Sequence, residues 1–170
     1  IITGLTGAET KRNNTGNPAL SLHYVECHDN YTLFDKLAIS YLDKEKYSGD
    51  LFTAIKEDGL STVKAQNKLS AAYIFLSQGT PFINGGQEFM RTKKGDENSY
   101  KSDDTINAID LSFKDTYSDV YNVYKGLIAL RKANPSAFGS NESATAEIYN
   151  KTAGVTKYTT GDFRVYFNAT

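Results

Sequence analysis

The feature that most constrains the fold of this sequence is a short apolar run that ends in a cluster of polar side chains. The run Leu22–Cys27 predicts a strand, and His28, Asp29 and Asn30 follow it directly. In folds with parallel strands, polar residues just beyond the carboxyl ends of the strands form the functional site. The segment therefore predicts an α/β fold with a site at the rim of its sheet.

A helix is expected directly after this site. Thr32 and Asp35 have the spacing of a capping pair, which predicts a helix that continues to about residue 41. Leu33, Leu37 and Ile39 are expected on its buried face.

The next elements follow in the order typical of a parallel sheet. Residues 4–19, before the first strand, predict an irregular loop, and residues 42–60 predict a surface loop with room for a short helix. A longer helix is expected over residues 62–77, with Gly79 as a left-handed residue beyond its end. Pro81–Gly85 predicts a second strand. Strands joined through helices by short connections indicate βαβ units.

The last third of the sequence changes character. A long polar connection over residues 87–114 precedes a helix over residues 117–133, which is followed by Pro135. Three short runs then predict an antiparallel meander: Ala146–Asn150, Val155–Thr159 and Phe163–Asn168. We therefore expect a domain boundary near residues 138–145.

Composition excludes several classes of protein. Among the 170 residues, 19 basic and 20 acidic side chains nearly cancel, which argues against a nucleic-acid surface. No run is apolar enough to span a bilayer, and no signal peptide is recognisable at the first residues. A single cysteine, Cys27, excludes an internal disulfide. The sequence leaves the cellular location open and is expected to be a portion of a longer protein.

The polar segments allow both structural and functional interpretations. Asp29 or Asn30 is a possible helix cap with His28 bonded locally, or the three residues form a ligand site. His23 and His28 are five residues apart on the expected strand and would point to opposite faces, which argues against a shared metal.

Two further polar segments follow the second strand. Glu88 and Arg91 are expected to form a structural ion pair. The segment Gly95–Ser102 is either a solvated loop or a sugar-binding loop, with amides and carboxylates for hydroxyl groups and Tyr100 for the face of a pyranose ring.

Taken together, four segments resemble the α-amylase superfamily of glycoside hydrolases, and specifically its type I pullulanases. They are Leu22–Leu37 (LHYVECHDNYTLFDKL), Ser77–Arg91 (SQGTPFINGGQEFMR), Gly95–Ser102 (GDENSYKS) and Leu127–Phe138 (LIALRKANPSAF). The resemblance implies that residues 1–140 are the C-terminal part of a (β/α)8 barrel, containing its strands seven and eight. Residues 141–170 would begin an antiparallel β-sandwich domain.

The resemblance also implies roles for individual residues. Asp29 would stabilise the transition state, and His28 would hold sugar hydroxyls at the cleavage subsite. Asn30, Asp96, Asn98 and Tyr100 would bind neighbouring parts of an α-glucan. The nucleophile and the acid/base would lie before Ile1, on strands four and five. No cofactor and no metal are expected.

The sequence departs from the family pattern at two positions. Cys27 stands where serine is common and Phe34 where tryptophan is common. Neither change is expected to abolish function, although Phe34 lacks an indole donor.

Several readings stay open. The chain is expected to be part of a debranching hydrolase of α-1,6-glucosidic bonds, and inactive alone. Its partners would be the glucan and the missing N-terminal part of the same barrel. The alternatives are an isoamylase or glycogen-debranching specificity, or a fragment that binds α-glucans without catalysis. A second chain that supplies the rest of the barrel is a further possibility.

Overall fold

The computed structural model describes residues 1–7 and 17–169. Contacts divide the chain into two compact units: the first comprises Ile1–Tyr24, Ala71–Phe82 and Gly126–Thr170, and the second Val25–Ser70 and Ile83–Lys125. The elements, in chain order, are α1 (Ile2–Leu5), η1 (Pro18–Leu20), β1 (Leu22–His23), α2 (Leu33–Tyr41), α3 (Leu51–Leu76), β2 (Thr80–Pro81), η2 (Gln87–Phe89), η3 (Ser99–Lys101), α4 (Asp104–Asn107), α5 (Phe113–Thr116), α6 (Ser118–Ala133), α7 (Pro135–Phe138), β3 (Thr145–Asn150), β4 (Val155–Thr160) and β5 (Phe163–Asn168). Within the described residues, no helix is both long and apolar enough for a membrane span.

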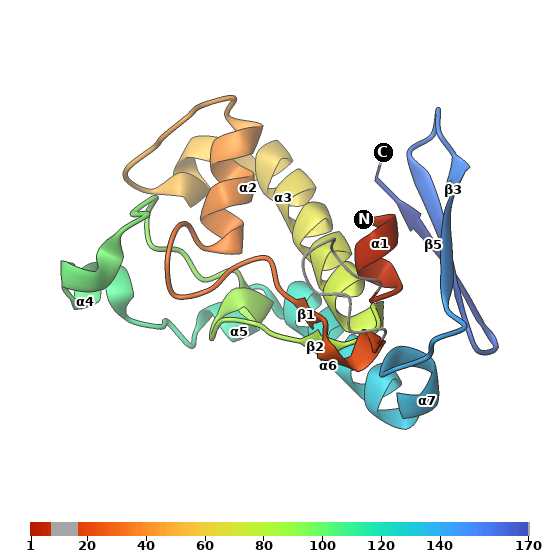
Figure 1. Cartoon of the computed structure of the whole chain (residues 1–170). Helices are drawn as coiled ribbons and strands as arrows, with labels where there is room; N and C mark the ends of the chain where they lie inside the picture. Colours follow the sequence, from red (N-terminus) through yellow and green to blue (C-terminus); the bar gives the residue numbers. More distant parts are fainter. Residues whose placement is uncertain (8–16, 170) are drawn as a thin grey trace. The chain divides into compact units, whose positions relative to one another are not determined.

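The first unit contains the predicted parallel pair of strands. β1 and β2 lie side by side with Leu22 opposite Thr80 and His23 opposite Pro81 (Figure 1). Both strands are two residues long, so the expected strands Leu22–Cys27 and Pro81–Gly85 were too long. The backbone ladder ends where Phe82 N donates to His23 O at 2.8 Å.

Gly79 leads the chain into β2. Its φ of +94° is left-handed as predicted, although α3 ends earlier, at Leu76. A Cβ at this position would lie 2.4 Å from Ser21 O, so only glycine fits against the segment before β1.

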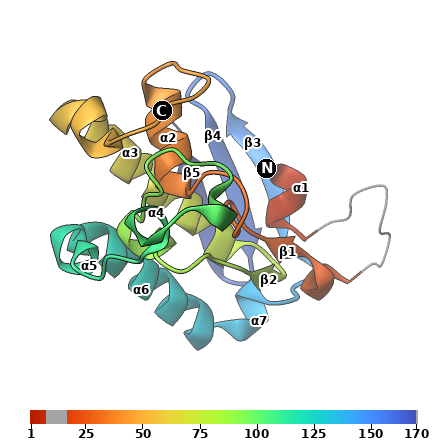
Figure 2. The same cartoon turned by 90° about the vertical axis from the view of Figure 1, so that its left-hand side faces the viewer.

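The meander of the first unit is confirmed. β3, β4 and β5 form an antiparallel sheet in chain order (Figure 2). Tyr158 and Phe167 are buried on one of its faces, and the ring of Phe167 stacks on Tyr73 of α3 at 4.1 Å between centroids. Tyr149 and Tyr166 are exposed.

The beginning of the chain differs in part from the expected irregular loop over residues 4–19. α1 and η1 are short helices at its two ends. Residues 8–16 of that loop lie outside the described residues.

In the second unit, α2 begins as predicted. Thr32 is its N-cap, and its hydroxyl accepts from Asp35 N at 3.1 Å. The buried stripe differs: Leu33 and Ile39 are buried, but Leu37 is only half-buried, because the stripe is centred on Phe34 and Ala38.

The start of α3 was predicted wrongly. The helix begins at Leu51, within the expected surface loop of residues 42–60, and is kinked at Lys56, where φ is 56°. Asp50 explains the early start, because its carboxylate accepts from Phe52 N at 3.1 Å and from the hydroxyl and amide of Thr53. An aspartate just before an apolar residue was the missed signal.

α6 agrees with the prediction at both ends. Val120 and Tyr124 are its buried residues. The Tyr124 hydroxyl donates to Asn67 Oδ1 at 2.8 Å and accepts from Gln87 Nε2 at 3.0 Å. These two bonds connect η2 to α3 and α6. The polar connection over residues 87–114 contains four short helices: η2, η3, α4 and α5.

Candidate functional site

The residues His28, Asp29 and Asn30 lie in a bend of the second unit, within the loop of residues 27–32 that we call the site loop. His28 is therefore not on a strand, and the argument that placed His23 and His28 on opposite strand faces does not hold. His28 Nε2 lies 3.3 Å from Asp29 Oδ2, and the two side chains are 87% and 70% exposed. Asn30 has a left-handed φ of 65°, which asparagine tolerates better than most residues. The loop presents an imidazole and a carboxylate to solvent.

The site loop is closed at its base by Glu26. This buried carboxylate accepts the amide of Leu33, the first residue of α2, through Oε2. A carboxylate at a helix N-terminus is favourable because the free amides there carry partial positive charge. Glu26 therefore joins the two ends of the site loop.

Asn84 holds the same loop from the segment after β2. Its Nδ2 donates to Cys27 O at 3.2 Å. A side-chain amide, instead of a backbone ladder, connects the two segments at this point. The Cys27 thiol lies 3.7 Å from Asp29 O.

Burial changes the acidity of Glu26. Its removal from water raises the pKa of Glu26 to about 7, while the Leu33 amide and Asn84 favour the ionised form and limit the rise. Sequence reasoning missed Glu26, although an acidic residue within a predicted buried strand was a usable signal.

The second predicted cluster forms a loop over residues 95–102, which we call the lip. Asp96 shapes the lip itself, because Oδ1 accepts from Asn98 N at 2.9 Å and Oδ2 from Ser102 Oγ at 2.6 Å. These bonds lower the pKa of Asp96, the Ser102 hydroxyl having the larger effect. Asn98 is exposed at the N-cap of η3, and its side chain makes no capping bond.

Tyr100 is the most prominent side chain of the lip. It is 74% exposed, and Lys101 Nζ lies 5.2 Å from its ring centroid. An exposed aromatic ring in the same loop as the exposed side chain of Asn98 is a surface suited to a flat ligand with hydroxyl groups.

The structure brings the site loop and the lip into one unit and links them through Asp35 and Lys93. The Lys93 ammonium donates to His28 O at 3.1 Å, and the Asp35 carboxylate accepts from Lys93 N at 2.8 Å and Gly95 N at 3.2 Å. Over the residues that the structure describes, the side chains of residues 28–30 make no direct hydrogen bond to those of residues 96–100, whereas Tyr31 of the site loop interacts directly with Glu97 of the lip. The sequence pattern predicted Asp35 only as a member of a helix-capping pair.

The expected ion pair between Glu88 and Arg91 is not formed, over the part of the chain that the structure describes. Glu88 Oε2 accepts from Gly86 N at 3.1 Å, while Arg91 donates to Gly85 O and Asn107 O. Both side chains satisfy backbone groups of nearby turns, which fixes the segment after β2.

Residues 1–7 and 17–169 contain no group of three or more acidic, histidine or cysteine side chains placed to hold a metal ion.

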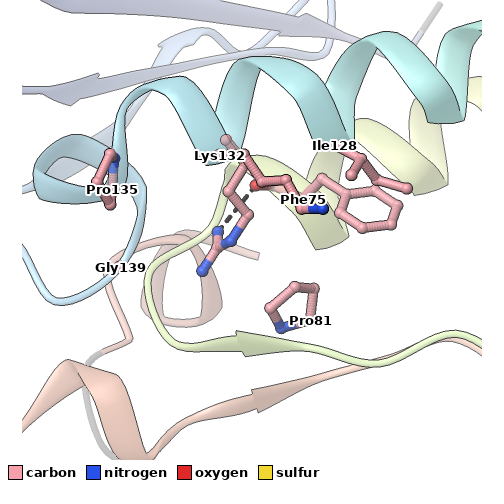
Figure 3. Close-up of a pocket in the computed structure, with 7 residues that line it drawn as sticks. Phe75, Pro81, Ile128, Lys132, Pro135 and Gly139 are labelled. Carbon is pink, nitrogen blue, oxygen red and sulfur yellow. Dashed lines mark hydrogen bonds between the residues drawn. The ribbon is translucent and has the colours of Figure 1, made fainter.

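The first unit has a separate pocket of about 350 Å³ (Figure 3). It is lined by apolar groups of Phe75, Pro81 and Ile128 together with Arg131 and Lys132. Arg131 donates to backbone carbonyls of Phe75, Ser77 and Gly79, so its guanidinium is already used to hold the turn before β2. Among the described residues, none of those that line the pocket carries a carboxylate.

Comparisons with known proteins place the chain in a family. No family model matches the sequence. The pullulanase of Bacillus subtilis (strain 168) is 38% identical over 135 residues, which are 79% of this chain and 17% of that protein. The solved type I pullulanase of Bacillus subtilis, in complex with maltose, is 31% identical with a TM-score of 0.74 over 94% of this chain and 21% of that one.

This chain belongs with the pullulanase-type debranching enzymes. An isoamylase of Pseudomonas amyloderamosa is more distant, at 26% identity over 134 residues, 71% of this chain and 17% of the isoamylase. The chain spans about a fifth of the length of the relatives it matches. Its fold is α/β, with a three-stranded antiparallel sheet at its end.

Proposed function

We propose that this chain supplies part of the active site of a hydrolase that cleaves α-1,6-glucosidic bonds in pullulan- and starch-like glucans. The observation that carries the proposal is the exposed His28–Asp29 pair on a loop anchored by buried polar groups, in a chain related to pullulanases. An exposed but anchored carboxylate can meet a substrate without losing its orientation.

We assign residues 1–140 to the C-terminal part of a (β/α)8 barrel and residues 141–170 to the start of an antiparallel β-sandwich domain. In this assignment β1 is barrel strand seven and β2 is strand eight. The parallel pairing of the two strands, with helices between them in the chain, supports the first assignment. The antiparallel order of β3, β4 and β5 supports the second.

The proposed reaction retains the configuration of the sugar. Retaining glycosidases need two carboxyl groups about 5 Å apart, one as nucleophile and one as acid/base. In our proposal both belong to parts of the protein outside this chain. Asp29 stabilises the positive charge that develops on the sugar ring, because a fixed negative charge acts strongly at a site that excludes water.

The remaining residues position the glucan. His28 donates or accepts at hydroxyls of the glucosyl unit that is cleaved, and Asn30 contacts the same unit. In the lip, Asn98 and Tyr100 bind neighbouring glucose units, while Asp96 preserves the shape of the loop in addition to any contact with sugar. The maltose complex of a structural relative supports a glucan as the ligand.

The test uses the full-length protein that contains this sequence. Asp29→Asn keeps the size of the side chain and removes its charge, so we expect kcat on pullulan to fall by about 100-fold or more. Asp58→Asn, at an exposed position of α3, is the matched control and should leave kcat unchanged. Retention of wild-type kcat by Asp29→Asn would refute the catalytic role of this carboxylate.

The alternative is an isoamylase or glycogen-debranching specificity, and the isoamylase relative supports the first of these. Parallel assays of the wild-type protein on pullulan and on glycogen separate the two specificities. Binding of both glucans without release of reducing ends would instead favour a purely binding role.

A further inference from the structure

Two buried side chains, Asp35 and Lys93, connect the site loop to the lip. One is in the first turn of α2 and the other lies just before the lip. Neither is exposed enough to touch a glucan: Asp35 is 0% and Lys93 is 5% exposed.

Asp35 holds the turn of residues 92–95 against α2. Its Oδ2 accepts from Lys93 N and Gly95 N, and its Oδ1 accepts from the Thr92 hydroxyl. Three donors on one buried carboxylate make a strong and directional anchor. Burial raises the pKa of Asp35, and these donors oppose the rise.

The turn itself leaves little freedom. Lys94 and Gly95 have left-handed φ values of 54° and 78°, and Gly49 N donates to Lys94 O at 2.9 Å. A Cβ on Gly95 would lie 1.8 Å from Tyr47 O, so the backbone of residue 95 is enclosed. The lip therefore starts from a fixed point.

Lys93 connects this fixed turn to the site loop. Its ammonium donates to the carbonyl of His28 at 3.1 Å, and this carbonyl belongs to the peptide bond that leads to Asp29. Lysine is rarely buried without a partner, so this contact dictates the path of the side chain. The same residue is thus held by Asp35 through its backbone and holds the site loop through its side chain.

We propose that Lys93 is a positioning residue for the reaction assigned above, and this inference rests on that proposed function. Through His28 O it sets the place of the Asp29 carboxylate relative to Asn98 and Tyr100 of the lip. A glucan held by the lip then presents its scissile unit to Asp29 at the right distance. Small displacements of a catalytic group reduce turnover strongly, whereas they change ground-state binding less.

The experiment compares variants of the full-length protein. Lys93→Met keeps the aliphatic stem and removes the ammonium, so kcat on pullulan should fall about 10-fold while KM changes less than about 2-fold. Lys93→Arg restores a cationic donor and should recover most of kcat. Lys36→Met, the same substitution at an exposed position of α2, should behave as wild type.

A second measurement does not depend on catalysis. Hydrogen–deuterium exchange, followed by mass spectrometry without substrate, should be faster in Lys93→Met for the peptide over residues 27–32. It should be unchanged over residues 95–102, because the backbone amides of Lys93 and Gly95 still donate to Asp35. Unchanged exchange over residues 27–32, or unchanged kcat in active protein, would overturn the proposal. Faster exchange spread equally over α2 and α3 would show a general structural role and overturn it as well.

The experiment distinguishes failure of the proposed function from failure of the positioning role of Lys93. If the wild-type protein cleaves no α-glucan, the proposed function fails, and the exchange data alone decide whether Lys93 couples the loops. If Lys93→Met gives no folded protein, Thr92→Val replaces it, because it keeps Lys93 and removes the hydroxyl that donates to Asp35 and accepts from Lys94 N. Thr92→Val should raise exchange over residues 27–32 and 95–102, and wild-type exchange in both peptides would contradict the coupling.

Discussion

At the scale of single residues, two buried carboxylates in the second unit show how position decides the role of an acidic side chain. Asp35 has three donors and anchors a turn, whereas Glu26 accepts the amide of Leu33 and closes the site loop. Both are removed from water, and the pKa of each is raised by burial. The exposed acid between them in the sequence, Asp29, is the one free to meet a ligand.

The raised pKa of Glu26 predicts a pH dependence of stability. The folded protein holds the Glu26 proton up to about pH 7, whereas the unfolded chain loses it near 4.5. The contribution of Glu26 to the free energy of unfolding is therefore fully present below about pH 4.5. It decreases as the pH rises to about 7. At about 1.4 kcal/mol per pKa unit, the loss is at most about 3.5 kcal/mol.

Glu26→Gln should remove this dependence, because the amide oxygen can still accept from Leu33 N and no charge is buried. Denaturant unfolding of the full-length protein should be measured at pH 5 and pH 8. The free energy of unfolding of the variant, relative to that of wild type, should be higher at pH 8 than at pH 5. Glu57→Gln, at an exposed position of α3, is the control. Parallel pH profiles of Glu26→Gln and wild type would contradict the assignment.

At the scale of elements, one glutamine holds the meander of the first unit. Gln78 is 0% exposed, and its Nε2 donates to Ala137 O, the Tyr158 hydroxyl and Thr160 Oγ1 at 2.6, 2.6 and 3.1 Å. Its Oε1 accepts from Asn141 N at 2.6 Å. The side chain thus joins the turn before β2 to α7 and β4.

We predict that Gln78→Ala destabilises this unit strongly. Removing one side chain breaks the buried hydrogen bonds of Gln78 to α7, β4 and Asn141 N, and the expected cost is about 3 kcal/mol. Limited proteolysis of the full-length protein should cut faster within residues 139–169, and denaturant unfolding should give the free-energy change. Gln66→Ala, at an exposed position of α3, should neither speed proteolysis nor lower the free energy of unfolding. Equal proteolysis rates for the two variants would refute the role of Gln78.

At the scale of the whole molecule, the chain contains the proposed transition-state stabiliser without the proposed nucleophile and acid/base. We therefore predict that the isolated 170-residue chain does not hydrolyse pullulan. Reducing-end assays on the purified chain, beside the full-length protein at equal concentration, check this. Turnover by the pure chain with no complementing fragment would show that a nucleophile lies within it.

The order of the elements followed from local patterns in the sequence. The apolar runs around Leu22 and Pro81, the Thr32 cap and the alternating residues after Gly139 act through neighbours close in the chain, so they were visible in advance. The family was also visible, because the motif around His28 and Asp29 is specific. The strand lengths and the start of α3 were not, because they involve hydrogen bonds between the backbone and the side chains of Asn84 and Asp50.

What the sequence determined by itself is the class of the fold, the family and the position of an exposed His–Asp pair after a strand. Only the tertiary structure decided how that pair is held. Lys93 lies 65 residues after His28, and Asp35 meets the turn that contains Lys93 across 58 residues. Contacts over such separations depend on how the chain packs, and no local periodicity encodes them.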